Sequence, residues 1–107
     1  MFINTKVFDK ECKKLDFTDS DLRSLENEIL ENPNVGRVVQ GTGRLRKLRF
    51  APDYTGKSGG YRIYYVNFTK QEIVYFILIY SKTDKENITK EERNSLKQLV
   101  DQLEAEL

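Results

Sequence analysis

The fold is decided by residues 61–80, which read YRIYYVNFTKQEIVYFILIY. Residues 61–68 are rich in aromatic and β-branched side chains, which favour a pleated strand. Residues 73–80 are apolar on both faces, which is typical of a central strand that helices cover on at least part of each side. The four residues between these runs, TKQE at 69–72, predict a turn. The stretch therefore predicts an antiparallel hairpin at the centre of a sheet.

Three other segments show helical periodicity. The first covers residues 5–15, and the second begins at a cap on Thr18 or Asp19 and ends at residues 32–34, Asn-Pro-Asn. The third begins at a T-x-x-E capping box formed by Thr89 and Glu92. The apolar stripes of the three helices are, in order, Phe8, Cys12 and Leu15; Leu22, Leu25 and Ile29; and Leu96, Leu99, Val100, Leu103 and Leu107.

The remaining extended segments place the hairpin in a larger sheet. Residues 2–4 predict a short opening strand, and residues 38–40 lead across Gly-Thr-Gly at 41–43 into a strand over residues 44–50. The order of elements is then β-α-α-β-β-β-α. We therefore expect an α+β fold with one curved, mainly antiparallel sheet on which the helices pack. The length of 107 residues suits a single domain over residues 1–107.

The composition indicates a soluble protein of the cytoplasm. Hydrophobic residues make up 38% of the chain and charged residues 33%. The longest apolar run, residues 73–80, is too short to span a bilayer, and the opening sequence MFINTKVFDKE lacks the apolar core of a secretory signal. The single cysteine, Cys12, cannot form an internal disulfide. We therefore expect a cytoplasmic protein without a membrane partner.

Charge is distributed very unevenly along the chain, although the net charge is only +1. Seven basic residues face one acid between positions 37 and 62, whereas six acids face one basic residue between positions 16 and 31. The acidic segment is most simply a solvated helix face, and the alternative is a contact with a basic partner. The basic segment is the candidate site for an anionic ligand.

Histidine is absent, and neither cysteine nor carboxylate residues show ligand spacing. We therefore expect no metal and no cofactor, and any acid–base chemistry must use Lys, Arg, Tyr, Asp or Glu. Cys12 lies on the apolar face of its helix and has no histidine to activate it. It is more simply a buried residue than a nucleophile.

Strand periodicity gathers cations and tyrosines on one surface of the sheet. Lys47 and Arg49 share one face of their strand with Leu45, while Arg46, Leu48 and Phe50 share the other. Arg62 shares a face with Tyr64, and Lys82 follows two residues after Tyr80. Phosphates bind cations and unstacked bases stack on flat rings, so such a surface suits single-stranded RNA or DNA. The alternative is a set of ordinary surface cations.

Four stretches together resemble the RelE/HigB family of bacterial toxins, the toxic halves of type II toxin–antitoxin pairs. They are GTGRLRKLR at 41–49, GKSGGYR at 56–62, YSKTD at 80–84 and NIT at 87–89. The resemblance covers roughly residues 34–100 and extends to the element order of the whole chain. The combination of GTG-x-LRK-x-R with GK-x-GG-x-R is its most specific part.

The resemblance implies a ribosome-dependent mRNA interferase, a metal-independent endoribonuclease. Such a toxin enters the ribosomal A site, where the 2′-hydroxyl of the exposed codon attacks the adjacent phosphate and the leaving 5′-oxygen takes a proton. Sites of this family can use Lys, Arg and Tyr in place of histidine. By position, the implied catalytic residues are Lys47, Arg49, Arg62 and Lys82, and the implied RNA-binding residues are Arg46, Lys57, Tyr64 and Tyr80.

Physical arguments suggest a role for each catalytic candidate. Neighbouring cations disfavour the charged form of Lys47, which can then act as a base. Arg49 and Arg62 can hold the scissile phosphate and stabilise its additional charge. Lys82 can protonate the leaving oxygen, and Tyr80 can stack on or orient a base.

Two positions depart from the family pattern. Residue 44 is Arg where Gly is more usual, and residues 87–88 hold no tyrosine, although some relatives use one there. Tyr64, Tyr65 or Tyr80 can supply the missing hydroxyl.

Two other functions remain open at this stage. ParE-like toxins share the fold and inhibit DNA gyrase without cutting RNA, so the fold alone cannot separate them from nucleases. A catalytically silent module that binds RNA or an antitoxin is the other alternative. For a toxin, the resemblance implies a HigA-like helix-turn-helix antitoxin as partner, with operator DNA bound only through the toxin–antitoxin complex.

Overall fold

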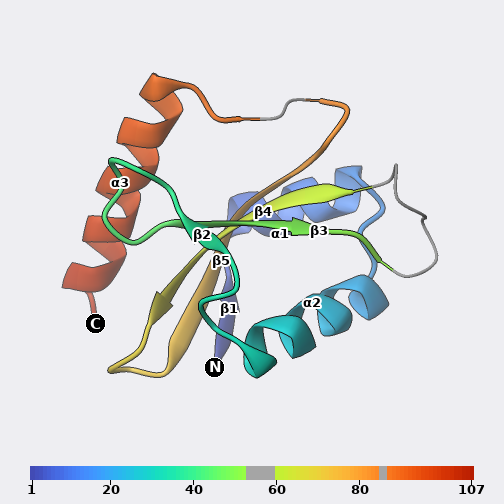
Figure 1. Ribbon diagram of the computed structural model, residues 1–107, viewed down its shortest axis with the longest axis horizontal. Coiled ribbons are helices and arrows are strands. Elements are labelled where there is room, and N and C mark those ends of the chain that lie inside the picture. Colours follow the sequence, from blue (N-terminus) through green and yellow to red (C-terminus); the bar gives the residue numbers. More distant parts are fainter. Residues whose placement is uncertain (53–59, 85–86) are drawn as a thin grey trace.

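The predicted hairpin of residues 61–80 forms the centre of the sheet in the computed structural model, which describes residues 1–52, 60–84 and 87–107 (Figure 1). Among these residues the elements are, in chain order, β1 (Phe2–Asn4), α1 (Lys6–Lys14), α2 (Asp19–Glu31), β2 (Arg37–Val38), β3 (Arg46–Phe50), β4 (Tyr61–Phe68), β5 (Ile73–Ser81) and α3 (Lys90–Ala105).

The sheet has the strand order β1-β5-β4-β3-β2. Only β1 runs parallel to its neighbour, β5, and the other adjacent pairs are antiparallel. This arrangement confirms the α+β class and the mainly antiparallel sheet. Tyr64 and Tyr65 are consecutive in β4 and lie on opposite faces of the sheet. Their partners on β5 are Leu78 and Phe76, so the register shifts there and Ile77 is the extra residue.

One segment differs from its prediction. Arg37 and Val38 do not lead directly into β3 but form a separate edge strand, β2, that pairs antiparallel with it. Gly41 and Gly43 adopt positive φ angles of 84° and 79°, which reverse the chain between β2 and β3. The Val39 N–H then donates to the Leu45 carbonyl over 2.7 Å. The described sheet therefore has one strand more than expected.

Helices cover both faces of the sheet. Helices α1 and α2 pack on one face, where Phe8 and Leu25 meet Phe50, Tyr65 and other buried residues of the strands. Helix α3 packs on the opposite face, where Val100 meets Leu45, Val66 and Phe68. Figure 1 shows α3 separated from α1 and α2 by the strands. This two-sided covering explains why β4 and β5 are apolar on both faces.

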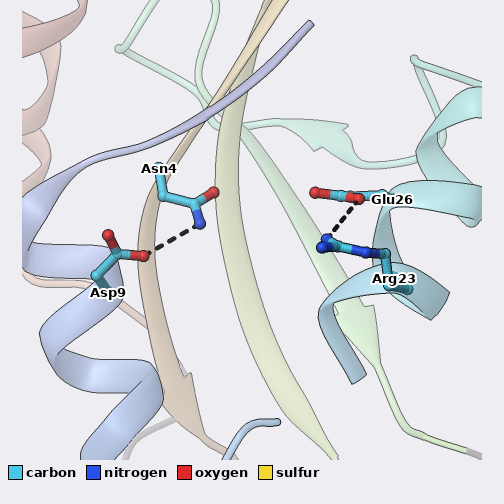
Figure 2. Close-up of polar contacts among 4 residues, drawn as sticks. All are labelled: Asn4, Asp9, Arg23 and Glu26. Atoms are coloured by element: carbon cyan, nitrogen blue, oxygen red, sulfur yellow. Dashed lines mark hydrogen bonds and ion pairs between the residues drawn. The ribbon is translucent and has the colours of Figure 1, made fainter. Parts of the chain in front are cut away.

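Local contacts fix the first two helices. Asn4 Nδ2 at the end of β1 donates to Asp9 Oδ1 on α1 over 3.1 Å, as Figure 2 shows. Helix α2 begins at a reciprocal capping box of Thr18 with Asp21, whose carboxylate is buried. Figure 2 also shows the pair of Arg23 Nη1 with Glu26 Oε1, 3.3 Å apart, on α2.

Helix α3 begins at the predicted capping box of Thr89 and Glu92, which exchange two hydrogen bonds. Within the described ranges, no helix has both the length and the apolar character needed to cross a membrane.

Candidate nucleic-acid interface

The register of the sheet brings the predicted cations into two cross-strand rows. Lys47 on β3 lies opposite Arg37 on β2 and opposite Tyr64 on β4. Residues paired in this way across antiparallel strands project from the same face. The first row therefore contains Arg37, Lys47 and Tyr64, and it lies on the sheet face that α3 covers in part.

The second row lies two residues further along β3. Arg49 is the partner of Arg62 on β4, and Arg62 is in turn the partner of Tyr80 on β5. Arg49 is exposed, whereas Arg62 is only 4% exposed and Tyr80 only 6%. The row thus runs from an exposed guanidinium at one side to a buried guanidinium and a buried phenol ring.

Both rows place like charges directly opposite each other. Arg37 faces Lys47, and Arg49 faces Arg62. Like charges in this position destabilise an antiparallel pair, with Cβ atoms only about 4.5–5.5 Å apart. Two such pairs in adjacent rows create a concentrated positive field on one face, which favours an anionic ligand.

A pair of tyrosines lies beside the cations. The hydroxyl oxygens of Tyr64 and Tyr80 are 2.8 Å apart, and both rings are buried. Burial raises the pKa of Tyr64, although hydrogen bonds with Tyr80 and with the Ile88 backbone reduce the rise. Burial and the hydrogen bond to Tyr64 raise the pKa of Tyr80 well above its ordinary value. Both hydroxyls are therefore neutral near physiological pH, where they can donate hydrogen bonds but cannot act as bases.

The segment that precedes α3 also contacts the first row. Lys47 Nζ donates to Asn87 Oδ1 over 2.7 Å. The neighbouring residue, Ile88, packs its side chain against the core beneath α3, and its backbone hydrogen-bonds with Tyr64. Asn87 and Ile88 therefore connect the start of α3 to the cationic rows.

A cleft opens along the outer edge of the first row. Its volume is about 560 Å³. Its lining includes Arg37, Lys47, Arg49 and Asn87 together with the valines at positions 35, 38 and 39. No acidic residue lines this cleft among the residues that the structure describes. The cleft therefore combines the cations of β2 and β3 with the apolar side chains of these valines.

Two predicted site residues, Arg46 and Lys82, lie outside the two rows. Arg46 projects from the opposite face of β3, where its Nη1 donates to the carbonyl of Gly36 over 2.7 Å and to that of Asn34 over 3.3 Å. Lys82 is exposed in the turn after β5, and its backbone N–H donates to the Gly60 carbonyl. Lys57 lies in the segment 53–59, outside the described residues.

The two departures from the expected pattern also have a structural account. Arg44 forms an ion pair with Glu104 of α3 and lies over the ring of Phe68, at the end of the sheet distant from the rows. Of the tyrosines that could supply the missing hydroxyl, Tyr64 and Tyr80 lie in the rows. Tyr65 faces α1 and α2, and its hydroxyl donates to the Pro33 carbonyl.

Sequence reasoning missed two residues of this surface, Arg37 and Asn87. Arg37 belongs to an edge strand whose existence depends on the glycine turn after it, and alternation on β2 would have placed it with Lys47. Asn87 reaches Lys47 from a part of the chain 40 positions away. No local sequence signal indicates that contact.

Cys12 belongs to the core and not to the cationic rows. Cys12 is buried, as predicted, and burial together with the nearby Asp9 and Glu11 carboxylates raises its pKa to about 12. The thiolate is therefore scarce at neutral pH. Among the described residues, no group of three or more Cys, Asp or Glu side chains is placed to hold a metal ion.

These features define a small α+β protein with a cationic sheet face bordered by a C-terminal helix. A family profile described as the RelE toxin of the RelE / RelB toxin-antitoxin system matches residues 1–106. The chain therefore belongs to the RelE toxin family. It is a toxin of a toxin–antitoxin system, and its partner is an antitoxin.

Proposed function

We propose that this toxin is a ribosome-dependent mRNA interferase that cuts mRNA in the ribosomal A site. The observation that supports the proposal best is the pair of like-charge rows, Arg37 with Lys47 and Arg49 with Arg62. Cations gathered in this way beside an open cleft attract the negative charge of a phosphodiester. The family membership supports the same activity.

In this proposal, Arg49 and Arg62 bind the scissile phosphate. Guanidinium groups can donate two parallel hydrogen bonds to phosphate oxygens, and the additional negative charge of the transition state strengthens these contacts. Arg62 is buried, and an anion interacts more strongly with a cation where water is largely excluded. Arg49 is exposed and can meet the substrate as it enters.

The proton transfers fall to the lysines. Lys47, with Arg37 directly opposite, takes the proton of the 2′-hydroxyl. The 2′-oxygen then forms a bond to phosphorus while the bond from phosphorus to the 5′-oxygen breaks. Lys82 donates a proton to that leaving oxygen. The products are a 2′,3′-cyclic phosphate and a 5′-hydroxyl.

The tyrosines take a supporting role. Tyr64 and Tyr80 are 1% and 6% exposed, and each hydroxyl faces the other. Their rings therefore offer little surface on which a base can stack. We propose that Tyr64 and Tyr80 hold the side chains of Lys47 and Arg62 in position. Arg46, with its guanidinium on two backbone carbonyls, holds the chain before β2 in the same way.

The proposed partners follow from the same function. The mRNA is met in the A site of the ribosome, and a HigA-like helix-turn-helix antitoxin neutralises the toxin. Operator DNA is bound only through the toxin–antitoxin complex.

Growth arrest by an Arg62→Ala variant tests the proposal. We expect arrest to be lost while binding of the antitoxin, which shows that the variant is folded, is retained. Because Arg62 is buried, its replacement could disturb folding, so a second variant, Arg49→Ala, changes an exposed residue of the same row. This variant should also lose most of its toxicity. Arg23→Ala, on the surface of α2, is the matched control and should arrest growth fully.

Full toxicity of both Arg62→Ala and Arg49→Ala would overturn the nuclease assignment. In that case, intact mRNA together with inhibited gyrase would favour the ParE-like alternative. Intact mRNA with active gyrase would instead favour a catalytically silent binding module.

A further inference from the structure

The cleft beside the first row is large enough for more than the scissile phosphate. Its volume of about 560 Å³ lies within the range of roughly 300–1,000 Å³ that is usual for small-ligand sites. Such a volume suits a single nucleotide unit. The cleft extends from Lys47 and Arg49 outward to Arg37 on β2, the edge strand of the sheet.

Arg37 differs from other arginines of the chain in its contacts. Arg23 pairs with Glu26, Arg44 with Glu104, and Arg46 with two backbone carbonyls. Arg37 is exposed, and its side chain makes no hydrogen bond or ion pair within the described ranges, 1–52, 60–84 and 87–107, although its backbone pairs with β3. Its strand is nevertheless held firmly, because Lys47 fixes its register and Gly36 packs against the Tyr65 ring.

The surroundings of Arg37 match a nucleotide rather than a simple anion. Val35 is 36% exposed, Val39 is partly buried on the sheet face of Tyr64, and both line the same cleft. They supply an apolar surface beside the cations, which suits a ribose or the face of a base. The Arg37–Lys47 row lies two residues, or about 6.7 Å, along β3 from the Arg49–Arg62 row. The rows can therefore hold two successive phosphates of one strand.

We propose that this cleft is a subsite for the nucleotide adjacent to the cleaved bond, and that Arg37 binds the phosphate of that nucleotide. This inference rests on the proposed function. Arg37 touches none of the reacting atoms, so its contribution is to binding and to the register of the RNA. Removal of its charge should weaken substrate binding and leave the chemical step unchanged.

The test is a cleavage assay in a reconstituted translation system with a defined mRNA. Rates are measured against toxin concentration for wild type, Arg37→Ala and the control Arg23→Ala. For Arg37→Ala we expect a half-saturating toxin concentration about tenfold higher and an unchanged limiting rate. The slope of log affinity against log salt concentration should become smaller by about one, because one counterion fewer is released on binding. The melting temperature should not fall, because the variant removes a like charge opposite Lys47.

A modified mRNA distinguishes a contact of Arg37 with mRNA from a contact of Arg37 with the ribosome. The phosphate on each side of the scissile linkage is replaced, one at a time, by an uncharged methylphosphonate. At one of the two positions, the methylphosphonate should lower the affinity of wild-type toxin as much as the Arg37→Ala substitution lowers affinity for unmodified mRNA. At that position, the methylphosphonate should not lower the affinity of the Arg37→Ala variant any further.

Three results would overturn the assignment. One is that the losses of affinity from the methylphosphonate and from Arg37→Ala add up at both positions, which would show that Arg37 contacts neither phosphate. Another is a lower limiting rate in Arg37→Ala at saturating toxin, and the third is an Arg37→Ala variant that behaves as wild type. Absence of cleavage by wild type itself would instead contradict the proposed function, and the subsite with it.

Discussion

At the scale of single residues, the contact of Lys47 with Asn87 is the most informative detail of the site. The ammonium nitrogen lies 2.7 Å from an amide oxygen that belongs to a distant part of the chain. A hydrogen bond of this type restricts a flexible side chain that would otherwise have many rotamers. We infer that Asn87 positions Lys47 for proton transfer.

The Asn87→Ala variant should therefore cut mRNA about tenfold more slowly, which corresponds to loss of one hydrogen bond to a charged group. Asn87→Asp should move the rising limb of the pH–rate profile to higher pH, because a carboxylate favours the ammonium form of Lys47 and delays its deprotonation. Single-turnover cleavage measured against pH checks both results. Asn94→Ala, an exposed position on α3, is the control. Rates and profiles equal to those of wild type would show that Asn87 does not position Lys47.

Individual contacts of this kind are what the sequence could not predict. Lys47, Arg49 and Arg62 were identifiable because alternation on strands assigns each residue to a face. Asn87 and the side-by-side hydroxyls of Tyr64 and Tyr80 depend on how strands and the approach to α3 meet in space. Arg46 shows the opposite case, since its charge suggested RNA while alternation had already placed it on the other face.

At the scale of elements, the Tyr64–Tyr80 pair joins β4 to β5 beneath the cations. Both pKa values are raised, so the folded state holds these protons more tightly than the unfolded state does. The resulting stability is fully present below about pH 10, the ordinary tyrosine value, and is lost as pH rises above it.

Tyr80→Phe should lower the free energy of unfolding at neutral pH by about 1–3 kcal/mol, because the Tyr64 hydroxyl loses a buried partner. The decline of stability above pH 10 should also become shallower. Urea unfolding at neutral and alkaline pH measures both effects, with Tyr75→Phe on the same strand as control. An alkaline decline as steep as that of wild type would contradict the role of this pair.

The edge strand β2 depends on Gly36. A Cβ atom at this position would lie 2.8 Å from the Tyr65 ring and 3.0 Å from the Lys47 carbonyl oxygen. Tyr65 is fully buried and hydrogen-bonded to the Pro33 carbonyl, so its ring cannot move away without further cost.

Gly36→Ala should therefore destabilise the protein by about 1–3 kcal/mol through overpacking. It should also weaken RNA binding, because β2 carries Arg37. Denaturant unfolding gives the first result, and the concentration dependence of cleavage gives the second. At Gly60 the nearest atom to an added Cβ is 3.7 Å away, so Gly60→Ala should change stability by less than about 0.5 kcal/mol. Equal stability of the two variants would contradict this account of β2.

At the scale of the whole molecule, the sequence predicts the fold class well. Clear apolar stripes, a capping box before the last helix and a long apolar hairpin each indicate one structure, and together they allow few arrangements. The part that escaped prediction was β2, because a two-residue strand has no periodicity of its own and forms only when the glycine turn brings it against β3.

The whole-molecule arrangement also explains how one sheet can carry a core and a site. Helices α1 and α2 cover one face, while α3 packs on the other face, where Val100 belongs to the same buried cluster as Tyr64 and Tyr80 of the rows. The exposed side chains of the two cationic rows are those of Arg37 and Arg49. Alternation along the same strands therefore supplies core residues to one face and the cations of the site to the other.

The most direct test of the central claim is primer extension on an mRNA translated in a reconstituted system, with wild-type toxin and with Arg62→Ala. The account predicts cuts within codons that require the ribosome, products that end in a 5′-hydroxyl and a 2′,3′-cyclic phosphate, and a loss of cleavage of at least about a hundredfold in the variant. Intact mRNA with wild-type toxin, or equal cleavage by Arg62→Ala, would contradict it.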